Sequence, residues 1–304
     1  MESRFIPNNF EPLFTLAKSN TYVQDTLTDI VTNYPPREVY EPRELAGFWH
    51  GPTGLAYLFF YVSNAYPHLK IAGHHALTWA KRYIHGGRDL LHLDPKRCGI
   101  GSELLAGHAV RACIMEDLGE VNKFLSYIES VLDGEYPNEL LHGRAGTLYL
   151  LRLMRHWIPG SAPLLEKAIT AVSQKIIAEG PEWVWYGKRY LGAVHGDISI
   201  VTQLVLTTPG LAQELETKML ELLDLQHPTG NWPSSVGSKE KISLVQFCHG
   251  APGFVTSLIS LRPYFPQLEH RIDSAIEAGR ECIWEEGLLR KEPNLCHGIL
   301  GNAL

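Results

Sequence analysis

The sequence V-Q-F-C-H-G-A-P-G at residues 245–253 has a second copy, P-N-L-C-H-G-I-L-G, at residues 293–301. Each copy places a cysteine and a histidine directly before a glycine, and a second glycine follows three residues later. Weaker copies occur earlier in the chain, and the first glycines of all copies are Gly51, Gly99, Gly143, Gly196, Gly250 and Gly298. The steps between them are 48, 44, 53, 54 and 48 residues, which indicates an internal repeat.

Each repeat has the pattern of a helical hairpin. The glycine pairs precede apolar runs that are too long for a typical strand, as in residues 54–63 and 146–154. Between these runs, residues 161–177 and 268–284 carry apolar side chains at helical spacing along one face. Such hairpins stack as an open solenoid or close into a ring, and buried inner helices favour the ring. We therefore expect an all-α fold with a single domain over residues 1–304.

The composition limits the partners and the compartment. The chain has 304 residues, and its net charge of 27 − 33 = −6 without a basic run indicates no nucleic-acid partner. No apolar run approaches the roughly 20 residues that span a bilayer, so we expect no transmembrane segment, and the first residues lack the apolar core of a signal peptide. An odd number of sparsely spaced cysteines is typical of a reducing compartment. The sequence therefore predicts a cytoplasmic protein.

A ring would gather polar side chains at one mouth. The residue before the first glycine faces that mouth in each repeat, and in five copies it is a histidine: His50, His142, His195, His249 and His297. Each of these histidines, taken alone, could instead hydrogen-bond a neighbouring turn. We expect His249 to contact a substrate at the mouth.

The two Cys-His-Gly motifs predict a zinc site. If adjacent inner helices begin at the same end of the ring, Cys248, Cys296 and His297 come together, and two thiolates with one imidazole are zinc ligands. Three protein ligands leave a fourth position for water or a substrate thiol, as in a catalytic site. The alternative is that both cysteines pack as small apolar residues between helices. His195, in a copy without cysteine, is the best candidate for a general acid or base.

These motifs, together with residues 139–146, 192–196 and 230–235, resemble the lanthionine synthetase C-like family, in particular its eukaryotic members. The resemblance runs over nearly the whole chain. It implies an α/α toroid of seven helical hairpins, of which about six are present here, with the last incomplete and the seventh missing. It also implies a Zn²⁺ cofactor and the addition of a thiol to dehydroalanine or dehydrobutyrine residues.

The resemblance also assigns residues. It places the zinc ligands on Cys248, Cys296 and His297, and the catalytic histidine on His195. It places a second catalytic residue on Glu139. Arg4 and Lys291 match basic residues with which eukaryotic members bind glutathione. The implied partners are glutathione and a peptide or protein that carries a dehydroamino acid.

Two other functions fit the sequence. Loss of the seventh repeat would suit a catalytically impaired module of the same fold that binds glutathione, a peptide or a signalling partner. An α/α-barrel carbohydrate-active enzyme also has aromatic loops at its mouth, but it needs two opposed carboxylates. Only Glu139 and Asp197 are expected near the mouth, and neither explains the cysteine pair.

Overall fold

The structure is a computed structural model that describes residues 3–10, 19–88, 92–238 and 244–303. The chain divides into two compact units. Unit 1 comprises residues 1–10, 137–149 and 169–304, and unit 2 comprises residues 11–136 and 150–168. The single domain that the sequence predicts stays a prediction, and its ends, Met1 and Leu304, lie outside the described residues.

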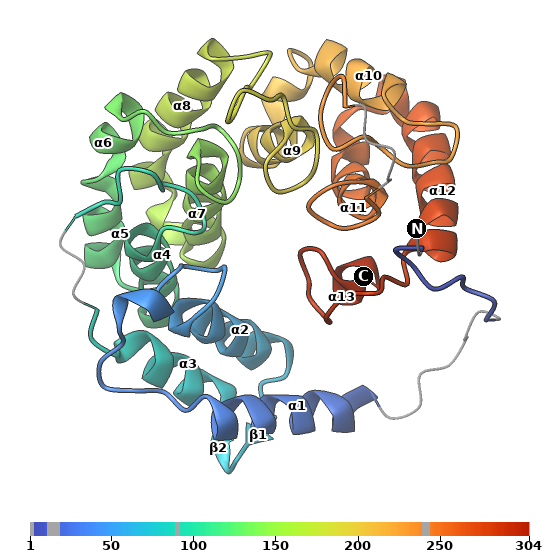
Figure 1. Ribbon diagram of the computed structural model, residues 1–304. Coiled ribbons are helices and arrows are strands. Elements are labelled where there is room, and N and C mark those ends of the chain that lie inside the picture. The colour runs from blue at the N-terminus through green and yellow to red at the C-terminus, as the bar shows by residue number, and fades with distance from the viewer. Residues whose placement is uncertain (1–2, 11–18, 89–91, 239–243, 304) are drawn as a thin grey trace. The chain divides into compact units, whose positions relative to one another are not determined.

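Unit 2 is built from helices and one short antiparallel sheet. Its helices are α1 (Ser19–Asn33), α2 (Pro52–Ala65), α3 (Ala76–His85), α4 (Glu103–Met115), α5 (Leu118–Leu125) and α6 (Ile128–Asp133). Strands β1 (Lys70–Ile71) and β2 (His74–His75) pair with Lys70 opposite His75. Helices α2 and α3 form a hairpin whose core stacks Phe59 on Tyr83, with ring centroids 5.6 Å apart (Figure 1).

Unit 1 contains the helices of the later repeats. Its helices are α9 (Asp197–Thr207), α10 (Glu216–Asp224), α11 (Ala251–Leu261), α12 (Glu269–Glu286) and α13 (Ile299–Asn302). Helices α7 (Arg144–Trp157) and α8 (Ala162–Ala178) contain residues of both units. In unit 1, α11 packs against α12 on one side and against α9 on another, so successive hairpins lie side by side (Figure 1).

The helices confirm the predicted all-α class. The apolar runs at residues 54–63 and 146–154 lie within α2 and α7, and the amphipathic segments at 161–177 and 268–284 form α8 and α12. On α8, the side chains of the predicted stripe are all buried: Leu165, Ile169, Val172 and Ile176. Within the described ranges, no helix combines the length and the hydropathy that crossing a membrane requires.

The loop at residues 226–238 of unit 1 contributes Trp232 to an aromatic core. Trp232 stacks on Phe254 of α11, with ring centroids 4.4 Å apart and planes at 3°. The Trp232 indole N–H donates to the Leu222 carbonyl of α10 at 2.9 Å. The preceding residue, Asn231, accepts the Ala251 N–H at 2.7 Å and so caps the start of α11. This loop therefore ties α10 to the first turn of α11.

Gly250, directly before α11, has a backbone conformation that other residues avoid. Its φ is +111°, and a Cβ at this position would collide with the main-chain carbonyl of Leu244. Pro252 follows in the first helical turn, where the absence of an N–H costs nothing. The Cys-His-Gly motif therefore needs glycine here for both conformation and space.

Replacing Gly250 with alanine should destabilise unit 1. We expect the Gly250→Ala variant to lose at least about 2 kcal/mol of unfolding free energy, because the new methyl group meets rigid backbone at a positive φ. Urea denaturation followed by circular dichroism measures this loss. Gly210→Ala is the matched control, since nothing lies within 4 Å of a Cβ built there. Equal midpoints for the two variants would contradict the prediction.

Candidate active site

The two Cys-His-Gly motifs meet in unit 1. The Cys248 N–H donates to the Cys296 carbonyl at 3.0 Å, so a main-chain hydrogen bond joins the two copies directly. The two cysteine sulfurs and a ring nitrogen of His297 lie within 4.8 Å of one another. Cys248 is buried, whereas Cys296 and His297 are half-buried. The structure thus brings all three sequence-predicted metal ligands together.

This group fits zinc by its chemistry and its dimensions. A tetrahedral zinc with Zn–S bonds of about 2.3 Å and Zn–N bonds of about 2.0 Å has ligand-to-ligand edges of roughly 3.5–3.8 Å. Ligand atoms that already lie within 4.8 Å reach these edges through small side-chain movements. Two soft sulfurs with one imidazole favour zinc over calcium or magnesium, which prefer oxygen ligands.

Side chains four residues before the first glycine organise the site in three repeats. Asn294 accepts the N–H of Cys296 at 2.7 Å and that of His297 at 3.2 Å. In an earlier repeat, Glu139 accepts the N–H groups of Leu141 and His142 in the same way.

The third of these side chains is Gln246, whose amide N–H donates to the sulfur of Cys248 at 3.1 Å. The sequence indicated Glu139, whereas Asn294 and Gln246 are recognised only from these contacts. Their shared position in the repeat is the signal that could have found them.

The hydrogen bonds around the two thiols favour Cys248 as the first to lose its proton. The hydrogen bond with Cys296 is the main cause that lowers the pKa of Cys248 to about 7, against the opposing effect of burial, and the Gln246 amide contributes further. The same thiol-to-thiol hydrogen bond raises the pKa of Cys296. Before any metal binds, Cys248 is therefore the more acidic of the two.

His195 lies beside Glu139 in a cluster of rings. The Nδ1 atom of His195 is 2.6 Å from Oε2 of Glu139. Because a carboxylate only accepts hydrogen bonds, this contact assigns the proton to Nδ1 and directs Nε2 toward the cluster. The rings of His142 and His249 lie 6.1 and 6.3 Å from that of His195. Three of the five predicted histidines therefore gather here.

Two aromatic side chains that sequence analysis did not assign complete this cluster. The indole of Trp185 stacks on the His195 imidazole, with centroids 4.6 Å apart and planes at 26°. Tyr190 lies 5.8 Å from the ring of His249. Trp185 belongs to the loop between α8 and α9. Stacking of this kind fixes the orientation of the imidazole.

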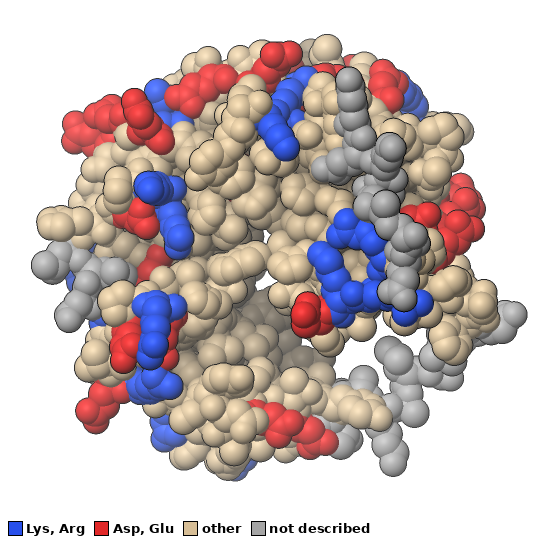
Figure 2. Space-filling view, viewed as in Figure 1, with Lys and Arg blue, Asp and Glu red and all other residues tan. Residues whose placement is uncertain are grey.

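The predicted glutathione-binding residues are linked to the site in different ways. The Lys291 ammonium is 3.4 Å from the amide oxygen of Gln246, whose nitrogen contacts Cys248. Arg4 is joined through its main chain, because its carbonyl accepts the Arg290 N–H at 2.9 Å. Lys and Arg side chains gather near the chain termini on the face shown in Figure 2. Arg290, which is bonded to Arg4 in this way, is a further cation that the sequence did not indicate as a glutathione-binding residue.

Two other sequence-predicted groups are not among the unit 1 residues that form this cluster. His50 belongs to unit 2. Asp197 is completely buried and forms ion pairs with Arg189 at 2.8 Å and Lys218 at 3.5 Å. Burial raises the pKa of Asp197 to about 6, although both cations favour its ionised form. A glycosidase needs two carboxyl groups that both reach the substrate, and a buried carboxylate with two cationic partners cannot act as the second of them.

The remaining cysteines are structural. Cys98, Cys113 and Cys282 are all buried. Burial raises the pKa of both Cys113 and Cys282 to about 12, so neither forms a thiolate at neutral pH.

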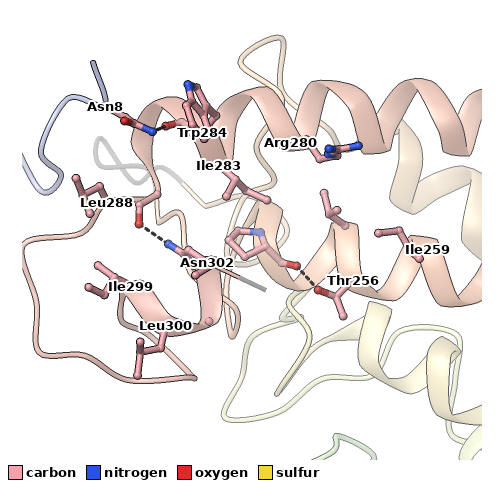
Figure 3. A pocket seen from close by; sticks show the side chains of 15 residues that line it. Asn8, Thr256, Ile259, Arg280, Ile283, Trp284, Leu288, Ile299, Leu300 and Asn302 are labelled. Carbon is pink, nitrogen blue, oxygen red and sulfur yellow. Dashed lines mark hydrogen bonds between the residues drawn. The ribbon is translucent and has the colours of Figure 1, made fainter. Parts of the chain in front are cut away.

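A separate groove of about 670 Å³ lies between α11, α12 and α13 (Figure 3). Ile259, Trp284 and Leu300 line it and are about half exposed. On one side of the groove, the Asn302 amide donates a hydrogen bond to the Gly287 carbonyl at 2.9 Å and so fixes α13 to the end of α12. None of the three candidate zinc ligands lines this groove, so it is distinct from the site described above.

The fold and the site define a class of all-α helical-repeat proteins with two Cys-His-Gly motifs at one candidate metal site. Residues 46–304 match the family described as lanthionine synthetase C-like protein, and the chain belongs to that family. It is 33% identical over 205 residues to a Danio rerio protein named glutathione S-transferase LANCL1. That match covers 60% of this chain and 49% of the relative, so the chain spans about half the length of the curated relative it matches.

Proposed function

We propose that this protein adds the thiol of glutathione to dehydroalanine or dehydrobutyrine residues in peptides or proteins, with zinc as cofactor. The observation that carries this proposal is the group of Cys248, Cys296 and His297, with ligand atoms within 4.8 Å of one another. The name of the Danio rerio relative, a glutathione S-transferase, supports glutathione as the thiol. The family resemblance implies the reaction class, and the sulfur-rich ligand set together with the nearby histidine supports it.

Each part of the site has a role in this reaction. Bound zinc supplies a Lewis acid that keeps a thiol ionised at neutral pH. Lys291 is suited to pair with a carboxylate of glutathione, because its ammonium reaches the Gln246 amide next to Cys248. Arg4 is suited to a second carboxylate, and His249 lies among the rings where the acceptor residue would enter.

The chemical step adds the S–H of glutathione across the carbon–carbon double bond, so a C–S bond and a Cα–H bond replace the S–H bond and the π bond. The thiol proton first passes to Nε2 of His195, which becomes an imidazolium, and the sulfur is left as a thiolate. The thiolate sulfur bonds to Cβ of the dehydroamino acid, and the electrons of the carbon–carbon double bond move toward Cα and its carbonyl. His195 then delivers a proton from Nε2 to Cα, which completes the thioether. Glu139 holds Nδ1 of the same ring at 2.6 Å and stabilises the charged imidazolium before that transfer. No leaving group and no oxidant are required.

The chemistry requires reduced cysteines. All five cysteines are free in the structure, including Cys248 and Cys296. We therefore propose that the protein works in the cytoplasm, where thiols stay reduced.

The direct test is glutathione addition to a short peptide that contains dehydroalanine. We expect zinc-loaded protein to convert the peptide into its glutathione adduct, measured by mass spectrometry, at a rate well above the reaction without protein. A peptide with alanine at the same position is the control. A zinc-loaded, folded protein that binds glutathione without accelerating addition would contradict the proposal and favour the binding module.

A variant of Lys291 tests the thiol substrate. We expect Lys291→Met to raise KM for glutathione about 10-fold with little change in kcat, because one charge-assisted contact to a carboxylate is lost. The comparison thiol is cysteamine, which has no carboxylate, and its kinetics should stay the same. Lys167→Met removes another exposed lysine, in α8, as a control. Equal losses with both thiols would show that Lys291 does not recognise the carboxylate.

A further inference from the structure

The loop before Tyr190 forms a tight hairpin with an uncommon residue at its tip. Trp185 and Lys188 exchange both main-chain hydrogen bonds, at 2.9 and 3.0 Å, so Tyr186 and Gly187 form a two-residue turn. Both central residues have positive φ, +47° at Tyr186 and +70° at Gly187. Turns of this kind strongly favour asparagine, aspartate or glycine at the first position.

Folding stability does not account for the tyrosine. A large side chain at positive φ is strained, and residues in such conformations gather at functional sites. Burial of the tyrosine side chain does not offset this strain, since Tyr186 is 80% exposed. Val184, two residues earlier, is 59% exposed. The tip therefore presents one aromatic and one branched aliphatic side chain to the solvent.

The base of the hairpin is fixed. Trp183 is buried, and its indole N–H donates to the Ile176 carbonyl at 2.9 Å. On the other side, Arg189 is paired with Asp197 at 2.8 Å and with Glu221 at 2.7 Å. A preorganised surface loses little conformational entropy when a partner binds.

A row of rings connects the tip to the catalytic histidine. Tyr186 and Trp185 have ring centroids 4.6 Å apart, and Trp185 and His195 also have centroids 4.6 Å apart. A molecule that packs on Tyr186 therefore lies two ring contacts from the imidazole that delivers the proton. The cation proposed for glutathione, Lys291, instead contacts Gln246 on the zinc-ligand side of the site.

We propose that the exposed tip formed by Val184 and Tyr186 binds the polypeptide that carries the acceptor residue, by packing against an aromatic or aliphatic side chain near that residue. This inference rests on the proposed function and names the class of its acceptor. An apolar tip does not suit the charged groups of glutathione, whereas exposed aromatic side chains on rigid supports are typical anchors for protein partners.

The test compares two acceptors and two measurements. The first acceptor is a ten-residue fluorescent peptide with dehydroalanine flanked by phenylalanine and leucine. The second is N-acetyl-dehydroalanine methylamide, which is too small to reach the tip while it reacts. Fluorescence anisotropy gives the peptide Kd without glutathione, and mass spectrometry gives the addition rate for both acceptors.

We expect Tyr186→Ala to weaken peptide binding about 10-fold, the loss typical of one aromatic anchor, and to leave the rate with the small acceptor within about twofold. Tyr186→Asn should lose the same affinity, because asparagine tolerates this backbone but lacks the ring. Tyr34→Ala is the matched control, since Tyr34 is 70% exposed in unit 2. It should change neither measurement.

Several results would overturn the inference. These are an unchanged peptide Kd in Tyr186→Ala, an equal loss of rate with the small acceptor, or a wild-type protein that does not bind the peptide. A change in association state by sedimentation with unchanged peptide Kd would identify the tip as a self-association surface instead. Peptide binding that depends on Tyr186 without any thiol addition would leave the inference standing and reject the proposed function.

Discussion

The Cys296→Ala variant is expected to lose its zinc and its activity together. Structural zinc sites with four protein ligands bind with apparent free energies of about 10–16 kcal/mol, or roughly 2.5–4 kcal/mol for each ligand. Removal of one thiolate should therefore weaken zinc binding by about 100- to 1,000-fold. Cys248 and His297 would remain within reach of each other, but two ligands do not retain the ion through dialysis. Elemental analysis of the dialysed protein measures the zinc content.

The control for this experiment is another cysteine of unit 1. Cys282 is buried in α12 and lies outside the candidate metal group. We expect Cys282→Ala to keep about one zinc per chain, as the wild-type protein should. Thiol labelling gives a second readout, because bound zinc should protect Cys248 and Cys296 from iodoacetamide. Full zinc content in Cys296→Ala would rule out the site described here.

His195→Ala should lower kcat for glutathione addition by about 1,000-fold while the zinc content stays unchanged. General acid–base groups contribute about 100- to 10,000-fold, and His195 is the imidazole that lies 2.6 Å from a carboxylate in this cluster. Glu139→Gln should cost about 100-fold, since it removes the charge that orients and stabilises the ring.

The double variant shows whether the pair acts as a unit. If Glu139 works through His195, the combined variant should be no slower than His195→Ala alone. Glu139 also accepts the N–H of Leu141 at 3.1 Å, so thermal unfolding must accompany the kinetics. Multiplicative losses in the double variant would assign Glu139 an independent role in catalysis.

The sequence could predict the parts of the molecule that follow the repeat. The 3.6-residue apolar period and the glycine pairs predict the helices, and α2, α7, α8 and α12 have the expected places. The internal repeat, which separates Gly250 from Gly298 by 48 residues, predicts that Cys248 meets Cys296, because equivalent positions of neighbouring hairpins lie at the same end. Family membership then confirms the class of fold, while closure of a ring stays a prediction.

The parts that could not be predicted depend on side-chain contacts that the repeat does not specify. Trp185 lies in a loop whose length varies from repeat to repeat, so no pattern in the sequence pairs it with His195. Gln246 makes its contact with Cys248 through a rotamer that spacing alone does not specify. Glutamine, glutamate and asparagine also differ enough to hide their shared position from a search for one residue type.

The main-chain hydrogen bond between Cys248 and Cys296 has a thermodynamic consequence. Because the bond joins the start of α11 to the segment before α13, zinc binding and the local order of that segment are linked equilibria. A ligand that binds only the ordered form adds RT ln(1 + [L]/Kd) to its stability, or about 2.7 kcal/mol when free ligand exceeds Kd 100-fold. If zinc binds at this site as proposed, its availability sets how often the four residues of α13 unfold, and hydrogen exchange in that segment would report the zinc concentration.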